Sequence, residues 1–412
     1  MLKKIFIVMA FAITAPIWGQ GTTSPYSFFG IGNLNFRGTV ENRLMGGVST
    51  YSDSIHVNLL NPAGLANLKL VNYSIAGSHK FNTLSTALDS ERATTTTLDY
   101  MAVAFPMGKF GGAFGLLPLT TSGYKLENID GTNTTQYTGS GGMNKVFFGL
   151  GYALTPELNL GVEANYNFGK IRNNAVTFQD DIQLGTEEDN ESDLLGLSMN
   201  LGLQYRRVLK GKLNGLASVS YTPETKFTSE NARQIATVLL LPNGNTSPID
   251  RRDIELANTD FVFPSQLTVG LGLVEERKWS LSAEVSAQKT SNLASSTVVL
   301  DNVTYEDALR FKMGGFYIPD YNSFSNILKR IVYRGGFRFE ETGINVNGNA
   351  ITEFGMSFGL GINLGRTFSN VNIGVEYGGR GTKNNGLVEE SFVNIFVGLS
   401  LNDKWFEKRL YD

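Results

Sequence analysis

Four cationic side chains are spaced so that they share one face of two neighbouring extended segments. Arg310 and Lys312 are two residues apart, and Arg334 and Arg338 are four apart. Residues separated by an even number point to the same side of a strand. Because guanidinium and ammonium groups bind carboxylates and phosphates, the pattern predicts a lumen wall that binds an anionic headgroup. The alternative is a salt-bridge network that holds an internal segment, with the candidate counter-ions Glu340, Glu353 and Glu376.

A second candidate site is a run of acidic residues within positions 180–193. Its members are Asp180, Asp181, Glu187, Glu188, Asp189, Glu191 and Asp193. Carboxylates are ligands that calcium prefers, but the run lacks the central glycine and final glutamate of an EF-hand loop. A calcium site and a solvated extracellular loop are therefore both open, and the pattern favours the loop.

Catalytic chemistry has little support in the sequence. The two histidines, His56 and His79, lie in different segments, and no G-x-S-x-G nucleophile elbow is present. The absence of cysteine excludes disulfides and thiolate metal sites. We therefore expect no enzymatic activity, no cofactor and no metal.

The composition limits the fold class. Glycine accounts for 46 of the 412 residues and charged residues for 18%, against roughly 25% charged residues in soluble domains. An aromatic content of 11% argues against disorder. A net charge of -3 gives no reason to expect nucleic acid as a partner. The length fits two or three soluble domains or one large barrel.

Residues 1–19 have the pattern of a secretory signal peptide. Lys3 and Lys4 precede an apolar run from Ile5 to Ile13, and small and turn residues follow. The run is too short to span a bilayer, which disfavours the alternative of a membrane anchor. The sequence therefore predicts an exported protein.

Alternation of apolar and polar residues dominates the rest of the chain. Every second residue is apolar from Leu158 to Phe168 and again from Leu195 to Tyr205. Runs of this length match tilted membrane-spanning strands of about 9–11 residues better than the shorter strands of a soluble sandwich. They predict an all-β fold, a 14-stranded antiparallel transmembrane β-barrel with apolar side chains facing lipid. The predicted strands lie near residues 70–81, 97–106, 111–124, 144–154, 158–176, 194–207, 213–226, 261–273, 279–289, 305–317, 332–341, 351–363, 371–379 and 390–401.

The connections between these strands alternate in length. Outer-membrane barrels have short periplasmic turns and long extracellular loops, so we predict the outer membrane of a Gram-negative bacterium, with both termini in the periplasm. One turn on the short side, 318–331, is long and is predicted to hold a short helix near 326–330. The long loops are predicted at residues 82–96, 125–143, 178–193, 227–260 and 290–304.

Glycines recur on the polar, inward faces of the predicted strands, for example Gly161, Gly202 and Gly359. A glycine in a strand marks close approach of other backbone or a bend. A lumen packed by a plug and simple barrel curvature are therefore both open.

Residues 20–69 do not alternate over a spanning length, and we predict that they form a hatch inside the barrel of residues 70–402. They contain Met45-Gly46-Gly47 and end in Asn61-Pro62-Ala63-Gly64-Leu65-Ala66. Together with the signal peptide, the fourteen strands and Phe263-Pro264-Ser265-Gln266 before a glycine-containing strand, this segment resembles the FadL family. Those proteins are outer-membrane transporters of long-chain fatty acids and other hydrophobic compounds.

The resemblance implies passive uptake of a hydrophobic small molecule through a barrel whose hatch moves or is kinked, with lateral release through a gap in the wall. Asn61, Pro62 and Gly64 carry over as hatch residues. The Asn-Pro step fixes a turn, and a turn in a static plug is the alternative. Pro118 departs from the strand pattern and predicts a bulge or local break.

Residues 403–412 continue past the last predicted strand as a charged tail that contains Trp405 and Phe406. The tail fits either a docking segment for an outer-membrane or periplasmic protein partner or an interfacial anchor in outer-membrane lipid. Some FadL-like barrels are subunits of larger machines. The second predicted function is therefore a non-transporting subunit of an outer-membrane protein-secretion or barrel-assembly complex.

Overall fold

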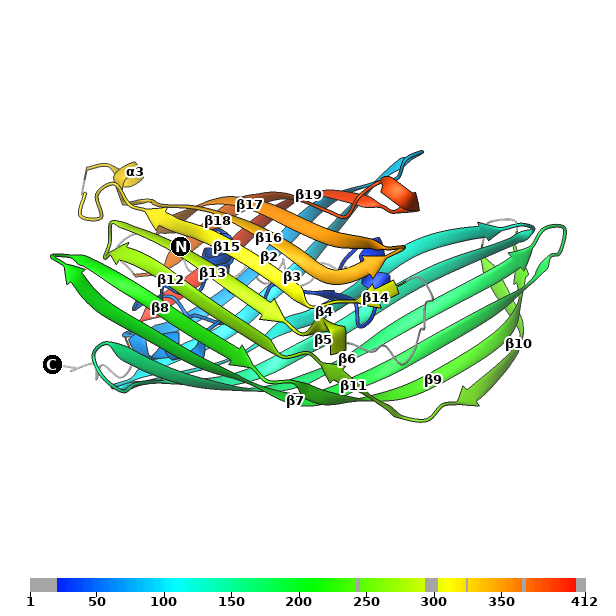
Figure 1. Ribbon diagram of the computed structural model, residues 1–412, viewed down its shortest axis with the longest axis horizontal. Coiled ribbons are helices and arrows are strands. Elements are labelled where there is room, and N and C mark those ends of the chain that lie inside the picture. The colour runs from blue at the N-terminus through cyan, green and yellow to red at the C-terminus, as the bar shows by residue number, and fades with distance from the viewer. Residues whose placement is uncertain (1–20, 242–244, 293–302, 324, 365–367, 405–412) are drawn as a thin grey trace, which may run out of the picture.

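The computed structural model describes residues 21–241, 245–292, 303–323, 325–364 and 368–404. Within this part of the chain, consecutive strands pair antiparallel until the last, β19, pairs with the first, β2, and closes a barrel (Figure 1). The prediction of an all-β, fourteen-stranded antiparallel barrel is confirmed. The barrel strands are β2 (Val71–Ser85), β3 (Ser90–Met107), β4 (Phe110–Asp130), β5 (Asn133–Ala153), β6 (Leu158–Gln179), β7 (Leu184–Lys210), β8 (Leu213–Thr222), β12 (Gln266–Glu275), β13 (Trp279–Gln288), β15 (Ala308–Tyr317), β16 (Val332–Val346), β17 (Asn349–Asn363), β18 (Asn370–Arg380) and β19 (Glu389–Asp403).

The outer face of the barrel carries the apolar half of the alternating pattern. Leu160 on β6 and Leu201 on β7 are 38% and 41% exposed, whereas their neighbours Glu163 and Asn200 are buried inside. Lipid solvates such an outer face, and closure leaves no unpaired backbone edge in the hydrocarbon region. Among the described residues, no helix has the length and apolar character needed to cross a bilayer.

One side of the barrel continues far beyond the other at the end that we call the hairpin end, opposite the short-turn end (Figure 1). Strands β4 to β7 are 21 to 27 residues long. Residues 184–195 of β7, at the hairpin end, pair with β9 (Thr225–Leu240). Strand β9 also pairs with β10 (Thr246–Glu255) and β11 (Thr259–Phe263). These strands form a sheet that rises above the apolar belt.

This extension corrects the prediction of long loops. Residues 125–143 and 178–193 are strands joined by tight turns, most of the described part of 227–260 is strand, and β2 and β3 likewise continue into a hairpin across 82–96. The prediction was wrong because apolar and polar residues do not alternate regularly along these parts of the strands, for example from Glu187 to Asp193. Backbone pairing continues there without the apolar alternation that marks a membrane-spanning strand.

The acidic run lies on this extension, with Asp180 and Asp181 in the turn between β6 and β7. Glu187 to Asp193 belong to β7, beside β6 and β9. Arg172 Nη2 lies 3.1 Å from Asp189 Oδ2, and Arg233 Nε lies 3.2 Å from Glu188 Oε1. Within the described ranges, no group of three or more His, Asp or Glu residues is placed to hold a metal ion. Cross-strand ion pairs therefore involve Asp189 and Glu188 of β7.

Two local predictions are confirmed. The long turn at the short-turn end holds α3 (Ile327–Arg330), whose first turn is capped by the Asn326 side chain. The β4–β5 register shifts between Pro118 and Thr120, as expected where proline cannot donate to the ladder. The remaining short elements are β14 (Val303–Tyr305), η3 (Thr290–Asn292) and η4 (Asn384–Gly386).

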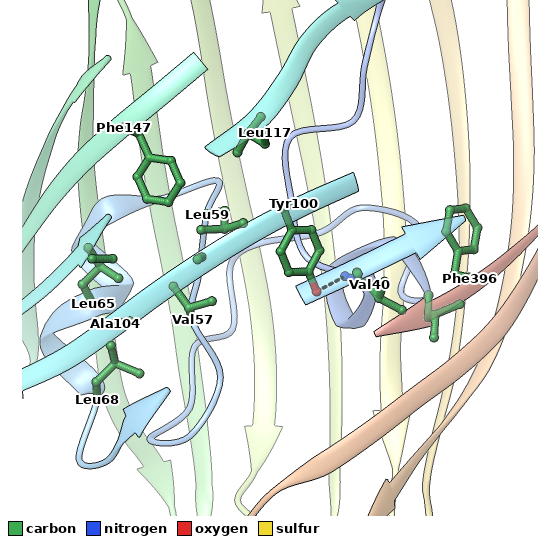
Figure 2. Packing of buried hydrophobic residues seen from close by; sticks show 14 residues of the cluster. Val40, Val57, Leu59, Leu65, Leu68, Tyr100, Ala104, Leu117, Phe147 and Phe396 are labelled. Atoms are coloured by element: carbon green, nitrogen blue, oxygen red, sulfur yellow. Dashed lines mark hydrogen bonds between the residues drawn. The ribbon is translucent and has the colours of Figure 1, made fainter. Parts of the chain in front are cut away.

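The N-terminal residues 21–68, which we call the hatch segment, lie inside the barrel. Their elements are η1 (Pro25–Phe28), β1 (Asn33–Leu34), α2 (Val40–Arg43) and η2 (Pro62–Asn67). Figure 2 shows Val40, Leu59 and Leu65 of this segment packed against Tyr100, Phe147 and other side chains of the wall. The predicted signal peptide, residues 1–19, and the tail with Trp405 and Phe406 lie outside the described residues.

Candidate functional site: the interface between hatch and wall

The hatch backbone lies directly on glycines of the inner wall. A Cβ atom added to Gly161 of β6 would overlap the backbone of Pro62 and Ala63, and one added to Gly202 of β7 would overlap the Asn61 side chain. At β16, a Cβ on Gly336 would overlap the backbone of Met45 and Gly46. The inward glycines therefore create the close approach that packs the lumen.

Asn61 anchors the η2 end of the hatch. Its side-chain amide donates to the carbonyls of Leu203 (3.2 Å) and Val219 (3.1 Å) on β7 and β8, and its Oδ1 accepts from the Ala63 backbone N–H at 3.1 Å. Pro62 follows at the first helical position, where a missing N–H costs nothing. The side chain of Asn61 thus caps η2 and fixes it to the wall. Movement of this turn stays a prediction.

Gly64 is required by packing within the hatch itself. A Cβ at this position would overlap Ser52 Oγ and approach Asn58 Cβ to 2.9 Å. The Asn58 amide in turn donates to Ser52 Oγ at 2.9 Å and to the Ser49 carbonyl at 2.8 Å. The turn predicted from Asn61-Pro62-Gly64 is therefore one side of a compact, internally bonded unit.

Glu284 on β13 binds the middle of the hatch. This carboxylate is 1% exposed, and its Oε1 accepts hydrogen bonds from the Ser49 N–H (2.5 Å), Ser49 Oγ (3.0 Å) and Thr50 Oγ1 (2.8 Å). Its Oε2 accepts from Lys312 Nζ at 2.6 Å, and the same ammonium donates to the Gly47 carbonyl at 3.1 Å. The Glu284–Lys312 ion pair of the wall therefore bonds to three residues of the hatch, Gly47, Ser49 and Thr50.

Glu376 on β18 binds the α2 end of the hatch. Arg43 Nη2 lies 2.7 Å from Glu376 Oε2, and Arg338 Nε donates to Oε1 at 2.8 Å. Arg338 also lies 2.5 Å from Glu353. A carboxylate with two guanidinium partners and no access to water is a strong, geometry-dependent contact. It joins the hatch to strands β16, β17 and β18.

The four predicted cations lie together on β15 and β16, three of them with carboxylate partners. Lys312 pairs with Glu284 and Arg338 with Glu353 and Glu376, while Arg310 pairs with Glu340. Arg334 donates to Asn372 Oδ1 at 2.7 Å, and the Asn372 amide donates to Glu41 of the hatch at 2.7 Å. The predicted counter-ions Glu340, Glu353 and Glu376 are thus in contact with the cations. An anion-binding role for this wall stays a prediction.

His56 lies at the short-turn end of the hatch segment, where it contacts both the hatch and the wall. Its Nδ1 lies 2.6 Å from Asp53 Oδ2, and its Nε2 lies 3.9 Å from Glu41 Oε1 and 3.3 Å from the Asn370 amide. Burial opposes a charge on the ring, but the Asp53 carboxylate and its hydrogen bond outweigh it and raise the pKa of His56 above 6.5. The His56–Asp53 pair is therefore a charged contact within the folded hatch.

A cavity of about 490 Å³ remains between the hatch and the wall. Its lining includes the charged side chains of Arg37, Lys80, Lys145, Glu163, Arg310 and Glu353. Lys145 Nζ lies 2.8 Å from Glu163 Oε1, and the Arg37 guanidinium donates to Gln266 at the start of β12. Serine, threonine and asparagine side chains complete much of the surface. The lining of the cavity is therefore mixed, because apolar side chains such as Phe36, Leu59 and Phe396 stand beside the polar and charged ones.

Sequence reasoning missed the residues that bond the hatch most closely. Glu284 lies within the predicted strand 279–289 without being singled out, and Arg43 and Glu41 lie in a segment without periodicity. A lone inward-facing glutamate between serines on a spanning strand was the available signal, because a buried carboxylate needs a partner.

Solved structures share the fold over nearly the whole chain. The toluene transporter TbuX of Ralstonia pickettii matches with a TM-score of 0.60 at 15% identity, covering 89% of this chain and 99% of that chain. The toluene transporter TodX of P. putida matches with a TM-score of 0.60 at 15% identity, covering 90% and 100%. A Pseudomonas aeruginosa FadL homologue matches with a TM-score of 0.61 at 10% identity, covering 92% and 100%. At these identities the likeness establishes a FadL-type outer-membrane barrel fold.

A comparison with curated proteins gave no match. The family model described as BamG matches residues 1–412. Since this match extends over the full length of the sequence, the chain belongs to the BamG family.

Proposed function

We propose that this chain is a closed outer-membrane barrel that acts as a protein-binding subunit of an outer-membrane secretion or barrel-assembly complex. The observation that carries the proposal is the bonding of the hatch to the wall by buried charges, through Glu284 at Ser49 and Thr50 and through Glu376 at Arg43. Removing one partner of a buried ion pair costs about 3–5 kcal/mol. Displacement of the hatch breaks several such contacts together, which opposes a transport cycle.

The chemistry of the cavity also supports a closed barrel. Sites for apolar small molecules are lined mainly by hydrophobic and aromatic side chains, with few polar groups. The cavity here adds several charged groups, Arg37, Lys145 and Glu163 among them, to an apolar and aromatic part of its lining. An apolar molecule that entered it would displace water from these charged groups, which is unfavourable.

The family name and the shape of the barrel favour the same function. The name BamG agrees with a barrel-assembly subunit. The strands at the hairpin end form a broad sheet above the apolar belt, and such a surface suits contacts with other proteins.

Purification from native membranes in a mild detergent, followed by mass spectrometry of the intact assembly, tests the proposal. We expect protein partners at a fixed stoichiometry and no bound fatty acid. A monomer that carries a stoichiometric fatty acid would contradict it. The Arg43→Met variant is the control for hatch integrity, since it loosens the hatch without changing the outer surface.

Passive uptake of hydrophobic small molecules is the second candidate. It is favoured by the fold shared with toluene transporters and by a cavity volume within the roughly 300–1,000 Å³ of ligand pockets. In this case Arg310, Lys312, Arg334 and Arg338 would receive an anionic headgroup such as a long-chain fatty carboxylate. Transfer of a fluorescent fatty acid into proteoliposomes distinguishes the two: uptake that is lost in Arg334→Gln/Arg338→Gln supports transport, and no transfer above protein-free liposomes excludes it.

A further inference from the structure

Strands β3 and β4 separate at the hairpin end. They pair only from Met107↔Phe110 to Met101↔Leu116, although each continues well beyond this point. The remainder of β3 pairs with β2 as far as Ser85↔Ser90, and the remainder of β4 pairs with β5 as far as Asp130↔Asn133. The barrel wall is therefore split between two strand edges.

The split begins where the outer face stops being apolar. Met101 and Leu98 of β3 are exposed on the outside, and the residues above them are Thr96 and Thr94. A cleft of about 430 Å³ lies in the split. Its walls include Glu91 and Ala93 from one edge, Gly123, Tyr124 and Lys125 from the other, and Thr23 and Pro25 of the hatch segment. The cleft therefore belongs to the water-facing part of the barrel.

The hatch segment already uses the β4 side of the split. Asn33 and Leu34 pair antiparallel with Thr121 and Thr120 of β4, and the Asn35 N–H donates to the Leu119 carbonyl at 3.0 Å. Strand β1 ends after these two residues. An extended segment that is not part of the barrel wall thus already pairs with an edge of this split.

The β3 side of the split has no such partner among the described residues. From Ser90 to Tyr100, β3 is paired along its β2 side alone. This edge contains the run Thr94-Thr95-Thr96-Thr97 and has no proline. Threonine is β-branched and favours strands, and natural proteins normally protect long free edges with proline, bulges or charges.

Strand β10 shows that protection in the same molecule. Within the described ranges it pairs with β9 alone, so it is also an edge. It carries Pro248, a register shift at that residue, and the charged pair Arg251-Arg252. The free edge of β3 lacks these devices along the threonine run.

We propose that the free edge of β3 at Thr94–Thr97 binds an extended segment of a second polypeptide, which adds a strand to the wall inside the split. Main-chain hydrogen bonds supply the affinity in this mode of recognition. The segment runs antiparallel to β3, and side chains of alternate residues face the solvent outside and the hatch–wall cavity that Thr95 and Thr97 line, next to the cleft at Ala93. This binding site does not depend on the proposed function, and the isolated chain is expected to bind such a segment.

Single-cysteine labelling tests this binding site, because the chain has no cysteine of its own. An environment-sensitive fluorophore is attached to Ala93→Cys in the cleft and, as the matched control, to Ala350→Cys at the hairpin tip of β17. The probe is a synthetic peptide of alternating threonine and valine with a lysine at each end. A second peptide has the same sequence with every amide N-methylated, so that neither of its edges can donate.

We expect a saturable change at the Ala93→Cys label, no change at the Ala350→Cys label, and loss of the change with the N-methylated peptide. Neighbouring N–H groups of β3 point in opposite directions, so one of the variants Thr95→Pro and Thr96→Pro removes a free-edge donor and is expected to abolish binding in a folded barrel. Equal signals at both labels, binding that tolerates N-methylation, or binding retained in both proline variants would overturn the proposal.

Discussion

Arg43 of the hatch segment and Glu376 of β18 form a buried ion pair, with Arg43 Nη2 2.7 Å from Glu376 Oε2. Glu376 is 1% exposed and also accepts a hydrogen bond from Arg338. The pair links a segment without sequence periodicity to one of the most regular strands of the barrel. Together with Glu284, it makes the hatch part of the barrel's folded core.

The variant Arg43→Met is expected to loosen the hatch. It leaves Glu376 buried with Arg338 as its remaining cation, and breaking a buried pair costs about 3–5 kcal/mol. Amide hydrogen exchange measures this as a lower opening free energy for α2 and the residues after it. The exchange of β7 serves as the internal control and is expected to stay unchanged.

A double-mutant cycle isolates the interaction between the two side chains. Arg43→Met/Glu376→Met is expected to lose less opening free energy than the sum of the single variants, because it leaves no unpaired charge at this point. Strict additivity in hydrogen exchange would show that Arg43 and Glu376 contribute independently.

Two adjacent glycines of β16 provide a test of the packed lumen. A Cβ at Gly336 would overlap the backbone of Met45 and Gly46, whereas a Cβ at Gly335 meets its nearest atom at 3.8 Å. Gly336→Ala is therefore expected to destabilise the docked hatch by about 1–3 kcal/mol through overpacking, and Gly335→Ala to change it by less than about 0.5 kcal/mol. Protease resistance of the hatch segment measures the difference. Equal effects in the two variants would argue against close hatch–wall contact.

The lipid-facing assignment predicts a position-dependent cost for a charge on β6. Leu160→Arg places arginine in the apolar belt, where it costs about 2–4 kcal/mol near the midplane. Val176→Arg places it farther along the same strand, beyond Lys170 and Arg172, where a much smaller effect is expected. Folding into liposomes under a denaturant series measures both. A negligible loss for Leu160→Arg would contradict the assignment.

The His56–Asp53 pair predicts a pH dependence of the hatch. The pKa of His56 is raised above 6.5 in the folded hatch, so its contribution to stability is fully present below pH 6.5 and is lost as the pH rises through the raised pKa. Iodide quenching of a fluorophore on Ser54→Cys is expected to increase as the pH rises through the pKa of His56, because the hatch becomes less stable. The additional change His56→Gln should flatten the response, and an unchanged pH profile in that variant would assign it to another group.

The barrel was predictable from the sequence because lipid and lumen impose opposite chemistry on alternate residues. Runs such as Leu158–Phe168 show this directly. The strands above the membrane were not found, since residues 184–193 of β7 and 225–240 of β9 lack a regular apolar alternation, although Phe227 and Val238 of β9 are buried. Backbone pairing continues regardless, because it needs no particular side-chain pattern.

Of the residues at the hatch–wall interface, only those of the barrel wall were predictable from the sequence. Strand parity placed Lys312 and Arg338 inside the lumen, and the inward glycines raised the question of a packed plug. The hatch partners Ser49 and Thr50 gave no signal, since their hydrogen bonds to Glu284 join segments far apart in the sequence. Such contacts depend on the folded path of a non-periodic segment, which local patterns do not determine.

The most direct test of a closed, non-conducting barrel is the current through the purified chain in a planar lipid bilayer. The buried contacts of Glu284 and Glu376 predict no stepwise current for the wild-type chain and discrete openings for Arg43→Met/Lys312→Met, in which both anchors of the hatch are weakened. A steady wild-type current equal to that of the double variant would contradict the account.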